Sequence, residues 1–150
     1  MIENLALSAV MVTATVIVHF SGILMLLHVL RRHGSKMRVH ESVVHQGVAV
    51  LFVMLSLLSI HGLEIWLYAV AFWLVGGFPE FETALYFSTS TFSSLGYGDV
   101  VLLPRWRMFG AIEAPNGLIL LAWSTAFLIS LMSRLRAMEH DWLERPKTKN

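Results

Sequence analysis

The sequence predicts an all-α membrane protein with three transmembrane helices and, between the second and third, a short re-entrant helix followed by a loop. Two observations predict this fold class. Hydrophobic residues make up 56% of the 150 residues and charged residues only 14%, whereas soluble domains carry about 25% charged residues. Three apolar runs also reach the ~20 residues that a helix needs to cross a bilayer, and they cover residues 5–30, 43–75 and 108–132.

The composition also excludes several function classes. The formal net charge of +1 is too small for a basic nucleic-acid-binding surface, so no nucleic-acid partner is expected. The chain has no cysteine, which rules out disulfides and thiolate metal sites. The sequence has no Ser-His-Asp arrangement, metal-ligand cluster or phosphate-binding motif near an aqueous pocket. We therefore expect a protein that is not an enzyme and needs no cofactor.

The first predicted span, residues 5–30, is expected to be a retained helix that forms an outer scaffold. No basic residue precedes it, and its apolar run is far longer than the ~7–15-residue core of a signal peptide. It has no Arg or Lys before its cytoplasmic end, so it cannot sense voltage as a charged helix does.

Lysine and arginine residues predict how the spans are oriented in the plasma (inner) membrane. They collect after the first and third spans, whereas only Arg105 and Arg107 lie between the second and third. Because basic loops remain in the cytoplasm, the N-terminus is expected outside and the C-terminal tail, residues 137–150, inside. The residues predicted to face the cytoplasm are Arg31, Arg32, Lys36, Arg38, Arg134, Arg136, Arg145, Lys147 and Lys149.

The second span, residues 43–75, precedes a segment that is too polar and too broken by glycine to cross the membrane alone. A short helix is expected over residues 81–92, with Glu80 and Glu82 at its N-terminus, where acidic side chains complement the helix dipole. Irregular backbone at membrane depth is tolerated only where it is buried in protein or lines water. Residues 94–99 are therefore expected to re-enter the membrane.

The segment Ser94-Leu95-Gly96-Tyr97-Gly98-Asp99 has the composition of an ion-coordinating loop. Gly96 and Gly98 can adopt positive φ because they lack a Cβ atom, so successive carbonyl groups can turn toward one axis. Rings of such carbonyl groups can replace the hydration shell of a potassium ion. Tyr97 is expected to point away from this axis as a packing spacer, and Ser94 to add a ring of hydroxyl groups.

Residues 84–99, Ala-Leu-Tyr-Phe-Ser-Thr-Ser-Thr-Phe-Ser-Ser-Leu-Gly-Tyr-Gly-Asp, resemble the pore helix and selectivity filter of potassium channels. The usual family pattern at the end of this segment is Thr-Val-Gly-Tyr-Gly-Asp, from which Ser94 and Leu95 depart. More narrowly, residues 43–136 look like small prokaryotic one-pore channels that carry an extra helix before the pore module.

The resemblance implies a homotetramer, embedded in membrane lipids, that conducts potassium passively. K+ would be the permeant ligand and the only metal ion, and Asp99 would brace the outer mouth of the filter. Residues 107–136 would form the pore-lining inner helix, which places Gly117 at the hinge position of the family. The residues implied to coordinate K+ are Ser94, Leu95, Gly96, Tyr97 and Gly98.

Pro115, Asn116 and Gly117 predict a bend in the third span. Proline frees the carbonyl group of Ala111 and bends the helix, and Gly117 relaxes the neighbouring backbone. The bend is either a static kink or a gating hinge.

Ionisable residues inside the spans need partners, because charge at membrane depth is costly. His61 and Glu64 lie three residues apart on one face of the second span, where we expect them to meet Glu113, Asn116 or Ser90 behind the filter. Some channels of the resembled family carry an acidic filter brace at the position of Ser90. Its absence here leaves Glu113 or Glu64 as a candidate brace; the alternative is that these residues only link helices.

His19 and His28, in the first span, have no metal-ligand spacing that other ligands support, and we expect them to pack between helices or at the membrane interface.

Two other functions remain open from the sequence. One is a nonselective cation channel on the same scaffold. The other is a membrane accessory or structural subunit, in which the glycine-containing segment packs against a partner.

Overall fold

The structure, a computed structural model, describes residues 1–34 and 43–144. Within these ranges it contains helices and no strand, in the order α1 (Ile2–Gly34), α2 (Val43–Leu74), α3 (Phe81–Phe92), the short 3-10 helix η1 (Pro104–Trp106) and α4 (Arg107–Glu144). Helix α4 continues beyond residue 136, the predicted end of the pore-lining inner helix. Five of the basic residues predicted to face the cytoplasm lie outside the described residues: Lys36, Arg38, Arg145, Lys147 and Lys149.

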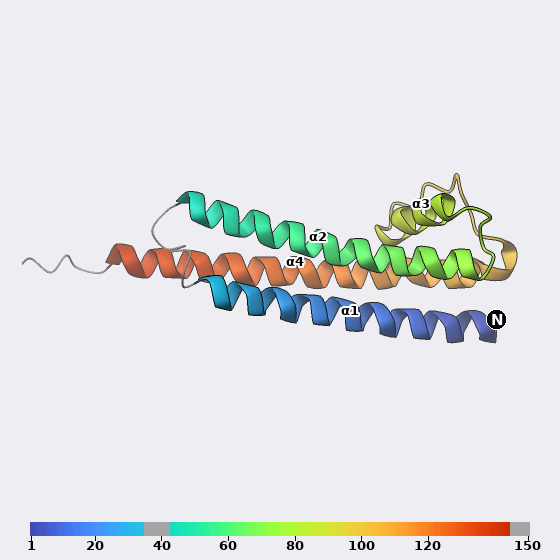
Figure 1. Ribbon diagram of the computed structural model, residues 1–150, viewed down its shortest axis with the longest axis horizontal. Coiled ribbons are helices and arrows are strands. Elements are labelled where there is room, and N and C mark those ends of the chain that lie inside the picture. Colours follow the sequence, from blue (N-terminus) through green and yellow to red (C-terminus); the bar gives the residue numbers. More distant parts are fainter. Residues whose placement is uncertain (35–42, 145–150) are drawn as a thin grey trace, which may run out of the picture.

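The prediction of an all-α membrane fold with three spans is confirmed. Among the described residues, three helical segments are long and apolar enough to cross a membrane: Ile2–Arg32, Val44–Leu74 and Pro104–Ser133. Each long helix contacts the other two, and they run side by side as a bundle (Figure 1). Most of their residues face outward, which suits a lipid environment because lipid chains solvate apolar side chains.

The short helix α3 packs against α2 and α4 at the end of the bundle where the N-terminus lies (Figure 1). Its 12 residues span only ~18 Å, which is too short to cross the ~30 Å hydrocarbon layer. It begins at Phe81 and ends at Phe92, as the sequence analysis expected. Glu82 lies in its first turn, and the N-cap residue Glu80 makes no side-chain capping hydrogen bond.

Large aromatic side chains fill the space beneath α3. The rings of Phe72 on α2 and Phe109 on α4 have centroids 4.8 Å apart, and Phe87 on α3 meets the edge of Phe72 at 5.3 Å. Tyr68 and Phe92 are also fully or nearly fully buried in this cluster. Because aromatic side chains bury large areas and pack in tilted and edge-to-face arrangements, this cluster fixes the position of α3 along the bundle axis.

Polar contacts join the start of α1 to the start of α4. The side-chain amide of Asn4 donates to the carbonyl oxygen of Arg105 at 3.0 Å, and its oxygen accepts from the backbone N–H of Phe109 at 3.2 Å. Asn4 thereby caps a backbone N–H in the first turn of α4, a role that polar side chains often take at helix N-termini. An exposed ion pair between Glu3 and Arg105 lies beside it. The N-terminus of α1 is thus fixed at the same end of the bundle as the loop that follows α3.

Candidate functional site

The loop after α3 alternates its backbone conformation residue by residue. Ser94, Gly96 and Gly98 have φ values of 60°, 55° and 74°, whereas Leu95 and Tyr97, between them, do not have positive φ. Both glycines thus adopt the conformation that the sequence analysis expected. Ser94 was not expected to do so, and it is the only non-glycine residue with positive φ in the described part of the chain. This alternation allows successive carbonyl groups to face one side of the loop.

Main-chain hydrogen bonds hold the loop against the end of α3. The carbonyl oxygen of Ser90 accepts from the backbone N–H groups of Leu95 at 2.9 Å and Gly96 at 3.1 Å, and the N–H of Ser94 donates to the carbonyl of Thr91 at 2.9 Å. The hydroxyl of Ser90 instead donates back to the carbonyl of Phe87. Ser90 therefore supports the loop through its backbone carbonyl group. The hydrogen bond of its side chain goes to Phe87 on α3 and not to the loop.

A second attachment holds the far end of the loop to α3. The hydroxyl of Tyr86 donates to one carboxylate oxygen of Asp99 at 2.7 Å, and the backbone N–H of Val100 donates to the other at 3.0 Å. The Tyr86 hydrogen bond is the main reason why the pKa of Asp99 lies below its ordinary value. The residue that restrains Asp99 in this chain, Tyr86, was not among the predicted site residues.

Glu113 contacts α3 through Ser88. A carboxylate oxygen of Glu113, on α4, lies 2.5 Å from the hydroxyl of Ser88, and the same hydroxyl lies 2.9 Å from the carbonyl oxygen of Ile65 on α2. Ser88 has one hydroxyl proton and can donate it to only one of these oxygens. A protonated Glu113 that donates to Ser88, while Ser88 donates to Ile65, satisfies both contacts. Glu113 therefore holds α3 in place, at a position before the loop itself.

The other oxygen of Glu113 has no hydrogen-bond partner within residues 1–34 and 43–144. An ionised carboxylate in this buried position would leave that oxygen uncompensated, at a cost of several kcal/mol. This geometry also favours the neutral carboxylic acid.

The predicted bend in α4 contains a link between the three long helices. The side-chain amide of Asn116 donates to the hydroxyl oxygens of Thr15 on α1, at 2.8 Å, and Tyr68 on α2, at 3.2 Å. Asn116 therefore bonds to α1 and α2, and not to His61 or Glu64. Helix α4 runs without interruption through Pro115. The bend at this proline stays a prediction.

Gly117 lies against the end of α3. A Cβ atom added to Gly117 would stand 2.2 Å from the carbonyl oxygen of Phe92 and 2.9 Å from its ring. Any larger residue would push the end of α3, and the loop that begins there, away from α4. The structure thus gives Gly117 a packing function, whether or not it also acts as a hinge.

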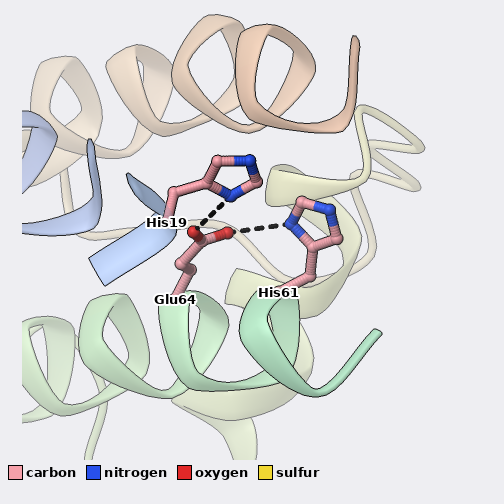
Figure 2. A group of neighbouring side chains, drawn as sticks. All are labelled: His19, His61 and Glu64. Carbon is pink, nitrogen blue, oxygen red and sulfur yellow. Dashed lines mark hydrogen bonds and ion pairs between the residues drawn. The ribbon is translucent and has the colours of Figure 1, made fainter. Parts of the chain in front are cut away.

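His61 and Glu64 meet a different partner from those expected. Figure 2 shows the carboxylate of Glu64 between two imidazole rings: Nδ1 of His19 lies 2.9 Å from one oxygen, and Nδ1 of His61 lies 2.8 Å from the other. Nε2 of His61 is also 2.9 Å from the hydroxyl of Ser124 on α4. None of Glu113, Asn116 or Ser90 is a hydrogen-bond partner of this group, so the predicted contact behind the filter is wrong. Glu64 consequently does not brace the loop.

His19 is a member of this group that the sequence did not predict. His19 lies on α1, 45 residues before Glu64, and is fully buried. The two helices contact each other, but no periodicity within either one shows which faces meet. His19 packs between helices, as expected, but the expectation that no other ligands support it was wrong. His28 is exposed on α1.

The fold and the loop define a class of protein: a multi-pass membrane protein in which a short helix and an irregular loop lie between two spanning helices. The chain belongs to the ion channel family, whose model matches residues 50–134, more than half of the 150 residues. The match covers the loop, α3 and most of α2 and α4, and it excludes α1. Searches of curated proteins and of solved structures found no match.

The contact between Ser88 and Glu113 can be tested by comparing two substitutions. We expect Ser88→Ala to lower the free energy of unfolding by ~1–3 kcal/mol, because Glu113 would lose its buried partner. We expect Glu113→Gln to cost less than Ser88→Ala, since an amide is neutral and can still donate to Ser88. Thermal or denaturant unfolding of the purified protein in detergent measures both. A Glu113→Gln protein that is less stable than Ser88→Ala would contradict a neutral Glu113.

The packing function of Gly117 gives a second prediction. We expect Gly117→Ala to destabilise the protein by ~1–3 kcal/mol, the usual cost of overpacking, because its methyl group would meet the backbone of Phe92. Pro115→Ala is the matched control, since it restores a helix donor and adds nothing at Phe92. Unfolding followed by circular dichroism compares the two. If Gly117→Ala were as stable as the wild type, the close contact with Phe92 would be refuted.

Proposed function

We propose that the chain is one subunit of a homotetrameric, potassium-selective channel. The selectivity filter would consist of Ser94, Leu95, Gly96, Tyr97 and Gly98. The observation that carries this proposal is the alternation of positive φ at Ser94, Gly96 and Gly98, in the loop that follows the C-terminal end of α3. This backbone can present successive carbonyl oxygens to a dehydrated cation.

The orientation of α3 adds an electrostatic reason. A helix carries partial negative charge at its C-terminus, and α3 ends at Phe92, directly before the loop. The Ser90 carbonyl is already used by two loop N–H groups, so the loop is fixed next to this negative end. Passive cation flux follows from such a site, and no catalysis is proposed.

Exposed apolar side chains around the loop support assembly. Leu95, Tyr97, Val101 and Leu103 are 61%, 67%, 60% and 55% exposed in the single chain. One copy of the loop also supplies only one wall of an ion cage. Four copies around an axis would bury these side chains between subunits and close the cage, and homo-oligomers generally assemble with such closed symmetry.

Orientation follows from the bundle and from charge. The N-terminus of α1 is bonded to the start of α4, at the same end as the loop. Arg31 and Arg32 lie near the opposite end of α1, and basic residues remain in the cytoplasm. We therefore propose that the N-terminus and the filter face the outside of the plasma (inner) membrane, with the C-terminus inside.

Two competing functions are separated by ion flux. A nonselective cation channel is favoured by one observation, the departure of Ser94 and Leu95 from the usual filter residues. In the channel that we propose, the reversal potential in mixed potassium and sodium follows the potassium gradient. A reversal potential near zero in equal total cation would identify the nonselective channel instead. An accessory subunit would conduct neither ion.

The purified protein in liposomes tests the proposal. We expect Gly96→Ala to reduce potassium flux ~10-fold or more, because a Cβ atom at this positive φ costs ~1–2 kcal/mol per chain and displaces the carbonyl groups. Gly47→Ala is the matched control: this helical glycine has nothing within 4 Å of an added Cβ atom. Native-size analysis of the same samples should give a tetramer. Unchanged flux in Gly96→Ala, or a monomer that conducts, would refute the proposed pore.

A further inference from the structure

A compact group of metal-binding side chains lies in the bundle outside the proposed ion path. His19, His61 and Glu64 each offer one ligand atom, and these atoms all lie within 4.8 Å of one another. All three side chains are buried, and they come from two helices, α1 and α2 (Figure 2). Neither the family match nor the proposed filter assigns a function to this group.

The charge of the group favours a cation. Glu64 is fully buried and hydrogen-bonded to both rings. If each imidazole is neutral and donates from Nδ1, the group has a net charge of −1 at membrane depth, where an uncompensated charge is costly. The described residues that face this group from α4 are Ser124 and Trp123, and neither is charged. The nearest ring of α3, that of Phe92, is apolar.

We propose that Nδ1 of His19, Nδ1 of His61 and a carboxylate oxygen of Glu64 bind a divalent transition-metal ion, with Zn2+ as the best match. Two imidazoles and one carboxylate form a donor set that suits zinc and leaves a fourth position for water. Imidazole nitrogen disfavours K+, Mg2+ and Ca2+, which prefer oxygen ligands.

The distances fit such an ion after small movements. In a tetrahedron with ~2.1 Å bonds, the ligand atoms lie about 3.4 Å apart. Here Nδ1 of His19 lies 2.9 Å from one oxygen of Glu64 and Nδ1 of His61 lies 2.8 Å from the other, and the three ligand atoms lie within 4.8 Å of one another. One hydrogen-bonded nitrogen-oxygen pair would therefore spread by about half an ångström, and the second nitrogen would turn toward the same oxygen.

Ser124 can accept hydrogen bonds from the imidazole nitrogens that do not bind the metal. When Nδ1 binds a metal, the imidazole proton moves to Nε2 and needs an acceptor, which metal-binding histidines nearly always have. The hydroxyl oxygen of Ser124 lies 2.9 Å from Nε2 of His61 and 3.5 Å from Nε2 of His19. One hydroxyl oxygen has two lone pairs, so Ser124 can accept from both rings.

A bound ion would fasten α1 to the pore module. His19 lies outside the matched residues 50–134, whereas His61 and Glu64 lie inside them. The His61 ring also lies 5.9 Å from the ring of Phe92, the last residue of α3, against which Gly117 packs. Metal binding would therefore restrain the end of α3, from which the loop continues, as well as the attachment of α1.

The full-length protein, produced in zinc-supplemented medium and freed of loose metal, tests the proposal. We expect about one zinc per chain by elemental analysis, and two imidazole ligands by X-ray absorption at the zinc edge. His19→Asn and His61→Asn should each lower zinc affinity at least ~10-fold. Asparagine can still donate to Glu64, so these variants keep a hydrogen bond and are expected to fold. His28→Asn and His45→Asn replace exposed histidines and should bind zinc as the wild type does.

The variant Gly96→Ala, for which we expect a reduced potassium flux, separates this proposal from the proposed function, because its zinc content should equal that of the wild type. Absence of stoichiometric zinc in folded wild-type protein would overturn the site and leave the group as a hydrogen-bonded link between helices. Zinc that remains in His19→Asn and His61→Asn but is lost in the control variants would also overturn it, since the ion would then bind to the exposed histidines.

Discussion

The structure depends on one constraint: every backbone polar group at membrane depth must find a partner, because lipid offers none. The three long helices satisfy their own groups, but the loop of residues 94–98 cannot. The carbonyl of Ser90 takes two of its N–H groups, which fixes the loop against the end of α3. The loop carbonyl groups are left to bind something else, and in the proposed channel they bind the permeating ion. Helix α3 must be held in a position from which the loop carbonyl groups can reach the ion. The contacts of Ser88, Phe92 and Gly117 hold it there.

Helix α4 is the main support of that arrangement. Glu113 holds α3 through Ser88, and one turn later Gly117 lets the end of α3 approach so closely that no side chain fits between them. The two contacts act on α3 at different points along its length, and together they resist its rotation. A hinge at Gly117 would therefore do more than change the shape of α4, because any rotation there would also move the carbonyl group of Phe92 and the loop behind it. Gating and filter geometry would be mechanically coupled at this glycine.

Much of the fold could be predicted because it depends on properties that a sequence displays directly. Span length, glycine position and the limits of α3 are local, and the positive φ of Gly96 and Gly98 follows from the residue type. Contacts between helices are not local. His19 and Glu64 meet because α1 and α2 pack with one particular rotation, which neither helix specifies by itself. Tyr86 was missed for a related reason: its hydroxyl reaches Asp99 only because the loop folds back along α3.

The packing of α1 shows what sets that rotation. Lipid chains are as apolar as leucine, so apolar contact alone gives a transmembrane helix little preference for one face, and polar groups supply much of it. The buried polar residues of α1 are Asn4, Ser8, Thr15 and His19, which lie at intervals of four or seven residues and so share one face. Asn4 binds the start of α4, Thr15 binds Asn116, and His19 binds Glu64. These three contacts, at successive depths, fix both the rotation and the height of α1. Helix α1 lies outside the matched residues 50–134, and these contacts hold it in one register against them. The His19 contact leads through Glu64 and His61 to Phe92, at the end of α3.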